Sequence, residues 1–172
     1  MGIITGVGRF AGIDDGRMSY DTRDVLERYR RLAVVGLSPN PARPSYRAIV
    51  HMKAAGYDIT PDNPRCDEGL GVPCVPSLAA AAELGPLEIV DIFRRIEEIP
   101  AIVDDAIEHG AKVIWMQLGL REPTAARRAR EAGLTVIEDR CVKIEHCRFF
   151  GGLGLMGLST GVVGSQRKGG SP

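Results

Sequence analysis

The sequence predicts an α/β fold with a doubly wound, mainly parallel sheet of five to six strands and flanking helices. Three helical stretches each end at a glycine, and a short apolar or β-branched run follows directly. These glycines are Gly56, Gly110 and Gly133. Glycine just past a helix takes the left-handed conformation that closes it, after which the chain turns into a strand. Repeated helix–glycine–strand units build a parallel sheet covered by helices.

Apolar periodicity places the helices between these strands. Residues 99–107 carry Ile, Val and Ala at spacings of three and four, which form one apolar face. Residues 46–50 repeat the pattern after Pro44, a residue suited to the first turn of a helix. Alanines over 125–132 form a small-residue face for close packing on the sheet, and an opening helix is expected over 22–31.

Short apolar runs predict the strands. We expect them at residues 32–36, 57–61, 89–93, 113–117 and 135–138, with a sixth, edge-like segment near 72–75. Right-handed crossovers between them give a Rossmann-like fold. In such sheets ligands bind beyond the carboxyl ends of the strands. Trp115 and Met116, within one of these runs, are interpreted as core residues.

Length and charge fit one cytoplasmic domain. At 172 residues the chain suits a single core. We expect residues 1–20 to be an N-terminal extension without a fixed fold, 21–150 to form the domain, and 151–172 to be a glycine-rich tail. Lys+Arg and Asp+Glu balance at 22 each, which gives no general attraction to nucleic acid or an anionic membrane. We find no signal peptide and no apolar run of the ~20 residues that a membrane span needs.

The first strand leads into the turn Gly36-Leu37-Ser38-Pro39-Asn40-Pro41. A glycine here lets the backbone pass close to a phosphate, and the next helix offers free N–H groups and the positive end of its dipole. Ser38, Arg43 and Ser45 can add side-chain donors. The alternative is an ordinary strand-to-helix turn without a ligand.

A nicotinamide dinucleotide site would need the pattern G-x-G-x-x-G at this turn. Only the first glycine is present, because Ser38 and Pro41 occupy the second and third positions. Asp62, after the second strand, could hold a ribose as such a site requires. The missing glycines outweigh that acid, so an NAD(P)-binding oxidoreductase is kept as the alternative function.

Polar side chains follow two further strands. Arg94 and Arg95 come after the third main strand, and guanidinium groups suit phosphate because their planar fork makes paired charge-assisted bonds. Neighbours on a strand point opposite ways, so we expect one of them to reach a ligand. The alternative is that one of them only pairs with Glu97 or Glu98. Gln117 is a further ligand candidate, since a polar amide there needs a partner.

The cysteines support two chemical hypotheses. Cys141 lies between Arg140 and Val142 with Lys143 close by, and neighbouring cations favour a thiolate, so a mixed disulfide with a thiol ligand is one reading. The second hypothesis, which we prefer, is that Cys141 is buried or takes no part in ligand chemistry. Cys141, His146 and Cys147 match no zinc spacing and lack an evident fourth ligand, so we predict no metal site. His51 and His109 are expected at helix surfaces or boundaries.

Several motifs in this order resemble one family, the small stand-alone CoA-binding proteins related to the nucleotide-binding domain of the succinyl-CoA synthetase α subunit. The resemblance covers residues 24–148, and the glycine-rich piece 151–167 is similar to an extension that some members carry. The motifs are residues 33–41 with Arg43-Pro44-Ser45, Asn63-Pro64, Val90-Asp91-Ile92-Phe93-Arg94-Arg95, residues 115–119 and residues 139–146.

The resemblance implies a binding site for coenzyme A or an acyl-CoA. The turn from Gly36 to Asn40, with Arg43, would meet the CoA phosphates. The adenine and ribose-phosphate end would lie by Asn63, Pro64, Phe93, Arg94 and Arg95, and the pantetheine side by Gln117, Leu118 and Gly119, with Cys141 near the same edge. Asp62 departs from the family, which usually has an apolar residue before Asn-Pro.

No catalytic residues are predicted. A CoA ligase with a phosphohistidine step needs a second domain and a nucleotide-binding subunit for which this chain has no room, and no Ser/His/Asp set or carboxylate pair stands out. We expect a non-catalytic carrier, sensor or regulator that binds CoA. A binding module of a larger acyl-CoA ligase assembly is a further alternative, and a homo-oligomer or an acyl-CoA enzyme partner is compatible with either.

Overall fold

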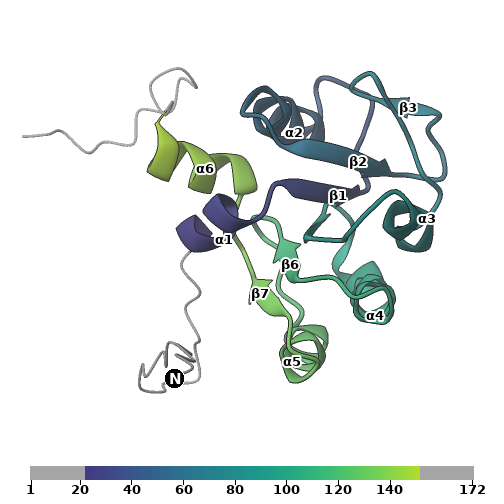
Figure 1. Cartoon of the computed structure of the whole chain (residues 1–172), viewed down its shortest axis with the longest axis vertical. Helices are drawn as coiled ribbons and strands as arrows, with labels where there is room; N and C mark the ends of the chain where they lie inside the picture. Colours follow the sequence, from purple (N-terminus) through teal and green to yellow (C-terminus); the bar gives the residue numbers. More distant parts are fainter. Residues whose placement is uncertain (1–21, 152–172) are drawn as a thin grey trace, which may run out of the picture.

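A computed structural model describes residues 22–151 of the chain (Figure 1). The predicted N-terminal extension and almost all of the predicted tail lie outside these residues. The main sheet has five strands in the order β2-β1-β5-β6-β7, and all neighbouring strands are parallel. The strands are β1 (Arg31–Val35), β2 (Asp58–Asp62), β5 (Ile89–Ile92), β6 (Val113–Met116) and β7 (Thr135–Ile137).

This sheet confirms the predicted fold class, and each of the five main strands begins and ends within one residue of its predicted bounds. The sixth segment differs. β4 (Val72–Pro73) pairs antiparallel with β3 (Glu68–Gly69) in a small separate sheet. A single bridge between Val75 and Asp62 connects this region to the main sheet. The predicted edge segment is therefore divided: Val72 and Pro73 pair within the β3–β4 hairpin, and Val75 pairs with the edge strand β2 of the main sheet.

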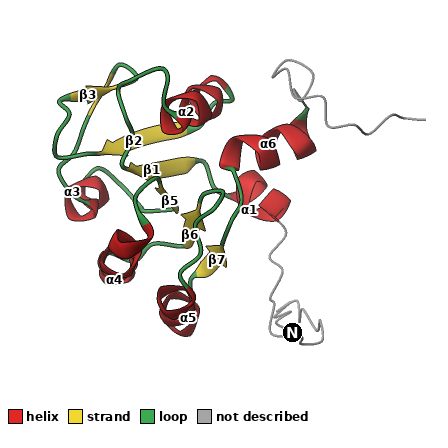
Figure 2. Cartoon of the chain, turned by 180° about the vertical axis from the view of Figure 1, so that it is seen from behind, coloured by secondary structure: helices red, strands yellow, loops and turns green. Residues whose placement is uncertain are grey.

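Helices cover both faces of the sheet (Figures 1 and 2). Three helices pack on each face. The first, second and last helices of the described chain cover one face, and the three helices between them cover the other. The first group is α1 (Thr22–Arg28), α2 (Pro44–Ala54) and α6 (Val142–Phe150), and the second is α3 (Leu78–Glu83), α4 (Ile99–Glu108), which follows a 3-10 turn at Ile96–Glu98, and α5 (Pro123–Glu131).

The two faces hold separate apolar cores because strand side chains alternate between them. Along β1, Ala33 and Val35 pack toward α3, α4 and α5, whereas Leu32 and Val34 pack toward α1, α2 and α6. Ala125, Ala126 and Ala129 of α5 are fully buried, as their spacing predicted, whereas Ala132, at the C-cap of the helix, is exposed. Trp115 and Met116 are core residues, and the Trp115 indole N–H is satisfied by the Arg140 carbonyl at 2.7 Å.

The strand order reverses direction at β1, which has β2 on one side and β5 on the other. The connection to β2 runs through α2 on one face, and the return to β5 runs through α3 on the opposite face. The loop after β1 leads to α2 on one face and the loop after β5 leads to α4 on the other, so the two loops turn to opposite faces at the carboxyl ends of their strands. This is the geometry of a ligand crevice in open α/β sheets. Among residues 22–151, none of the helices has the length and apolar character that crossing a membrane requires.

Candidate functional site

The carboxyl ends of the parallel strands bring every predicted ligand residue to one edge of the sheet. These residues are Gly36, Leu37, Ser38, Pro39, Asn40 and Arg43 after β1, Asn63 and Pro64 after β2, Phe93, Arg94 and Arg95 after β5, Gln117, Leu118 and Gly119 after β6, and Cys141 after β7. Parallel strands place their carboxyl ends together, so residues up to 105 positions apart in sequence share this edge. Their side chains differ in what they contact.

Gly36 is the point at which the turn after β1 meets the loop after β5. Its φ is +88°, in the left-handed region that favours glycine. A Cβ there would lie 2.7 Å from the Phe93 carbonyl oxygen and 3.0 Å from the Nε of Arg94. Glycine is therefore required both by the backbone conformation and by the close approach of the neighbouring loop. The same contact places the Arg94 guanidinium beside the turn.

Side chains within the turn stabilise its shape. The Ser38 amide donates to Oγ of Ser45 at 3.2 Å, and Oγ of Ser38 accepts from the Asn40 amide at 3.2 Å. Oδ1 of Asn40 accepts from the Ala42 amide at 2.9 Å, which closes an Asx turn. Ser45, considered above as a phosphate donor, is only 5% exposed, so its hydroxyl acts mainly within the turn.

The N-terminus of α2 opens beside this turn. Its N-cap residue is Arg43, which makes no side-chain capping bond, and Pro44 follows as the first helical residue. The first turn contains no acidic side chain. The described structure thus leaves the positive end of an eleven-residue helix without an anionic or side-chain cap, next to an exposed guanidinium. Such an end attracts phosphate groups.

Asn63 connects the turn after β2 to the turn after β1. Its Nδ2 donates to the Leu37 carbonyl at 2.8 Å, and its Oδ1 accepts from the Arg65 amide at 3.1 Å. The Leu37 side chain is fully buried and belongs to the core on the α2 side of the sheet. Leu37 and Asn63 therefore shape the edge, whereas the exposed Pro64 lies on its surface.

The two arginines after β5 separate as the sequence suggested. The Arg94 side chain is 25% exposed and lies beside Gly36, with its Nε 3.8 Å from Oε2 of Glu98. Arg95 is 82% exposed and points away into solvent, where its Nε meets Oε1 of Glu98 at 3.0 Å. Arg94 is thus the arginine that faces the edge. The alternative pairing with Glu98 is also present.

Asp62, the residue that departs from the family pattern, is only 6% exposed at the end of β2. Burial raises its pKa to about 6, since the charged form is poorly solvated there. The nearby Arg94 charge lowers that pKa and Asp105 raises it. An acid that is partly protonated near neutral pH therefore lies close to the arginine at the ligand edge.

Gln117 satisfies its amide inside the protein. Its Nε2 donates to Oδ1 of Asp91 at 2.6 Å, and its Oε1 accepts from the Val142 amide at 3.3 Å. The predicted need for a partner is met by these two bonds, which connect β5 to the start of α6. Only 6% of Gln117 is exposed.

Asp91 is a residue to which the sequence analysis assigned no role. It is fully buried in the middle strand, and its Oδ2 has no hydrogen-bond partner within the described residues. Burial raises its pKa to about 7, and the hydrogen bond from Gln117 opposes that shift. An acid between the apolar residues Val90 and Ile92 was the available signal, because only a special environment tolerates it.

The loops after β6 and β7 meet at Gly119. Its φ is +84°, and its amide donates to Oδ1 of Asp139 at 2.7 Å. Oδ2 of the same carboxylate lies 2.9 Å from a guanidinium nitrogen of Arg121. Leu118, one residue earlier, is 67% exposed. This part of the edge therefore presents an apolar side chain on a loop held by Asp139.

Cys141 caps the N-terminus of α6 and is partly buried. Burial raises the pKa of its thiol, and this effect outweighs hydrogen bonds from the Ile144 and Lys143 amides and the Lys143 charge. The pKa of the thiol is thus raised, whereas the neighbouring cations alone would lower it. The spectator reading of Cys141 is therefore the better supported of the two hypotheses.

A separate hollow of about 620 Å³ lies on the outer flank of α2, facing the β3–β4 hairpin. Pro39 is the predicted ligand residue that lines it, together with Tyr46, Val50 and Lys53 of α2 and Leu70 of the hairpin. Through Pro39 the hollow borders the turn after β1, and Arg94 is not among its lining residues. It can accommodate part of a ligand that extends from this turn.

Comparison with known proteins identifies the family. Residues 30–147 match the family described as the CoA binding domain. This chain belongs to the CoA-binding domain family. The uncharacterized protein YneT of Bacillus subtilis (strain 168) is 43% identical over 126 residues, which cover 73% of this chain and 92% of YneT. The resemblance seen in the sequence motifs is thereby confirmed at the level of the family.

Solved structures share the fold of this CoA-binding domain. A protein from Pyrococcus horikoshii OT3 is 35% identical with a TM-score of 0.72, over 84% of this chain and 100% of that one. A dinucleotide-forming acetyl-coenzyme A synthetase from Ca. Korarchaeum cryptofilum is 22% identical with a TM-score of 0.55. That similarity covers 62% of this chain and 25% of the synthetase, and it shows the fold alone.

Replacing Gly36 with alanine should destabilise this CoA-binding domain more than the same change at Gly133. Both glycines have a φ of +88°, but a Cβ at Gly133 would meet nothing within 4 Å. The shared left-handed conformation costs roughly 1–2 kcal/mol for a residue with a Cβ. Gly36→Ala must in addition displace the Phe93 carbonyl. Urea unfolding of both variants measures the difference, and equal losses of stability would contradict the close approach.

Asp91 should make the protein less stable as the pH rises from about 4 to about 7. Its pKa is raised from 3.8 to about 7 in the folded protein, so the folded state binds the proton more tightly than the unfolded state over this range. The stabilising contribution is complete below pH 3.8 and is lost as pH rises through about 7. Asp62, whose pKa is raised to about 6, likewise lowers the stability of the folded protein as the pH rises.

Asp91→Asn should flatten this pH dependence, because the amide is a neutral substitute for the protonated acid. Unfolding free energies of wild type and variant are compared across the pH range by urea titration. If the variant keeps the full wild-type slope, Asp91 is not the titrating group.

Proposed function

We propose that this CoA-binding domain binds coenzyme A or an acyl-CoA at the carboxyl edge of its sheet and acts without catalysis, as a carrier, sensor or regulator. The observation that carries the proposal is the group formed by the Gly36 turn, the uncapped N-terminus of α2 and the Arg94 guanidinium beside them. Membership of the CoA-binding domain family supports the choice of ligand.

This group suits the pyrophosphate of CoA. Main-chain N–H groups at a helix start and a guanidinium provide charge-assisted hydrogen bonds, which are stronger than neutral ones. Arg43 and Arg94 approach the turn from different elements, so a phosphate chain above Gly36 can meet a cation on each side. The exposed Leu118 offers an apolar contact for the pantetheine arm farther along the edge.

The buried polar residues divide the predicted site into two kinds of position. Leu37, Asn63 and Gln117 use their side chains inside the protein, so we assign them to shaping the pocket. We assign direct ligand contact to Arg43, Arg94 and the backbone of the turn. Cys141 is assigned no chemical role, since burial raises the pKa of its thiol.

An NAD(P)-binding oxidoreductase is the competing function. The acid after β2 that such a site needs for a ribose is Asp62, which is only 6% exposed and carries a pKa raised to about 6. The burial of that acid and the turn without its second and third glycines both disfavour a nicotinamide dinucleotide. A role within a larger acyl-CoA ligase assembly is a further alternative, supported by the fold that the chain shares with the synthetase noted above. We expect the protein to be cytoplasmic, and a homo-oligomer is compatible with each of these functions.

CoA should bind to the purified protein, and both Arg43→Ala and Arg94→Ala should weaken it. Removing one partner of a charge-assisted hydrogen bond costs about 1.5–3 kcal/mol, or roughly 10- to 150-fold in affinity. The melting temperature without ligand should change little, because both arginines lie at the surface or edge. Isothermal titration with CoA, and with NADH and NADPH in parallel, measures this.

Arg127→Ala is the matched control, since Arg127 is 69% exposed on α5 and pairs with Glu131. It should leave CoA affinity unchanged. Stabilisation by NADH or NADPH without stabilisation by CoA would support the oxidoreductase instead. CoA binding that neither Arg43→Ala nor Arg94→Ala affects would place the ligand elsewhere.

A further inference from the structure

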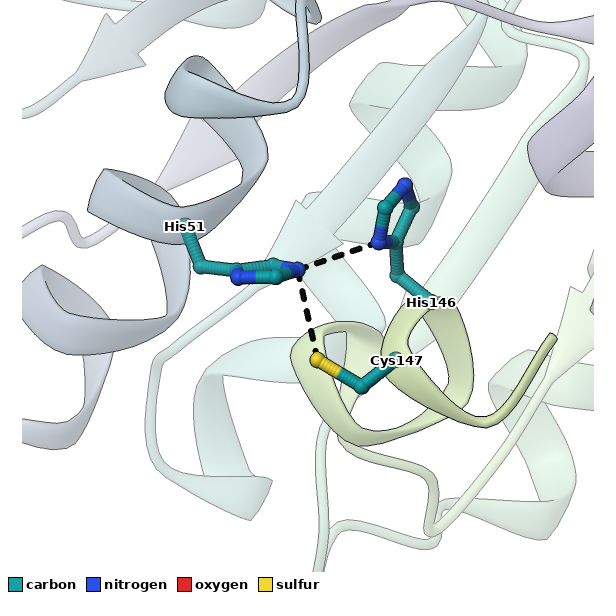
Figure 3. A group of neighbouring side chains, drawn as sticks. All are labelled: His51, His146 and Cys147. Carbon is teal, nitrogen blue, oxygen red and sulfur yellow. Dashed lines mark hydrogen bonds between the residues drawn. The ribbon is translucent and has the colours of Figure 1, made fainter. Parts of the chain in front are cut away.

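Two imidazoles and a thiol converge at the contact between α2 and α6 (Figure 3). His51 comes from the last turn of α2, and His146 and Cys147 from the middle of α6. His51 Nε2 lies 3.0 Å from Nδ1 of His146 and 3.4 Å from Sγ of Cys147. All three potential ligand atoms lie within 4.8 Å of one another. Residues separated by 95 positions thus point at one spot.

Hydrogen bonding alone does not account for both contacts of Nε2 of His51. The Nε2 atom of His51 carries either one hydrogen or one lone pair, so it can make one strong hydrogen bond. Two neighbours nevertheless approach it, from different residues of α6. A single metal ion would accept a lone pair from each of the three atoms at once.

The distances are close to those of a metal coordination sphere. Zinc binds imidazole nitrogen at about 2.0 Å and thiolate sulfur at about 2.3 Å, so tetrahedral ligands lie roughly 3.3 Å apart for two nitrogens and roughly 3.5 Å for nitrogen and sulfur. The two observed separations from His51 Nε2, 3.0 and 3.4 Å, need to change by only a few tenths of an ångström, and Nδ1 of His146 lies within 4.8 Å of Sγ of Cys147. Small side-chain movements would therefore admit an ion.

The surroundings favour ligand forms with available lone pairs. Burial lowers the pKa of both His51 and His146, with smaller effects from Lys143 on the first and from His51 and Arg30 on the second, which favours the neutral imidazoles. Cys147 is 1% exposed, and burial raises the pKa of its thiol although Lys143 opposes this. Metal binding would release that proton to solvent, as thiol ligands require.

Aromatic rings enclose the cluster. The His146 ring packs edge-on against Tyr57, with ring centroids 5.6 Å apart, and lies 4.8 Å from the Phe150 ring. His146 is 8% exposed and His51 is half-buried, so an ion would reach the cluster from solvent on the His51 side. The two rings give the His146 side of the cluster apolar surroundings, which limit the access of solvent to a metal site.

We propose that His51, His146 and Cys147 bind a single thiophilic metal ion with a filled d shell, zinc(II) or copper(I), between α2 and α6. Thiolate and imidazole ligands together select these ions over calcium and magnesium, which require oxygen. Copper(I) is satisfied by these three ligands and forms a neutral unit with the thiolate beside the cations Lys143 and Arg30. Zinc(II) would take water as its fourth ligand.

The site is distinct from the proposed CoA site and does not rest on it. His51 lies seven residues after Pro44, so the cluster is about 10 Å along α2 from the end that faces the ligand edge. The metal prediction made from sequence was negative because it considered Cys141, His146 and Cys147. The structure replaces Cys141 in that set with His51.

Metal binding is tested on the full chain, first freed of metal with a chelator and kept reduced. Cobalt(II), a coloured substitute for zinc, should bind in a 1:1 ratio and give thiolate-to-cobalt charge-transfer absorption. Zinc(II) and copper(I) affinities follow from competition with chromophoric chelators, and binding of either ion in a 1:1 ratio supports the site. Cys147→Ser should abolish the absorption, and His51→Gln should weaken binding at least about 100-fold, since loss of outer-shell partners alone costs 10- to 100-fold.

Two variants serve as controls. Cys66→Ser removes a thiol that contacts Cys74 in the segment after β2, and His109→Gln removes the histidine of a second group with Asp105 and Glu108. Both should bind cobalt as the wild type does. His51→Gln alters a half-buried side chain, so it decides the result if Cys147→Ser does not fold by circular dichroism. Absence of binding by all three ions overturns the proposal, as does binding that His51→Gln leaves unchanged or that a control variant removes.

Discussion

The close approach of two loops at the carboxyl end of β1 sets the geometry of the whole ligand edge. The Gly36 amide donates to the Asp62 carbonyl on one side, and the Val35 carbonyl accepts from the Phe93 amide on the other, both at 2.9 Å. These bonds extend the parallel pairing one residue beyond β1 toward both neighbours. Because Gly36 has no Cβ, the loop after β5 can cross close to the turn and place Arg94 beside it. A larger residue there would separate the very elements that approach a ligand.

Several polar side chains at this edge make hydrogen bonds within the protein and so are not available to a ligand. Asn63 fastens one turn to another, and Gln117 joins the middle strand to the start of α6. Buried polar groups must be hydrogen-bonded, and doing so fixes the loops that carry them. The groups left for a ligand are then main-chain amides and the mobile ends of arginines, which are the donors that phosphate favours. Asp91 is the exception, a buried acid with one oxygen lacking a partner in the described structure.

The two proposed sites share their supporting helices. α2 begins at the Gly36 turn and ends near the imidazole cluster, and α6 begins at the Gln117 bond and carries His146 and Cys147. An ion between these helices would hold together two elements whose first residues border the ligand edge. The fold therefore places a phosphate-binding end and a thiol–imidazole cluster on the same pair of helices without bringing them into contact.

The sequence by itself determined the order and bounds of the main strands, because apolar runs and helix-ending glycines are local signals. It also determined which turns share an edge, since parallel strands leave no other arrangement. Only the tertiary structure decided that Val72 and Pro73 pair with β3 rather than with the main sheet, and that Arg94, rather than Arg95, lies beside Gly36. Burial likewise raises the pKa of the Cys141 thiol, although the neighbouring positive charge of Lys143 lowers it. His51 meets His146 and Cys147 for the same reason: packing of α2 against α6 joins residues whose separation in sequence carries no signal of contact.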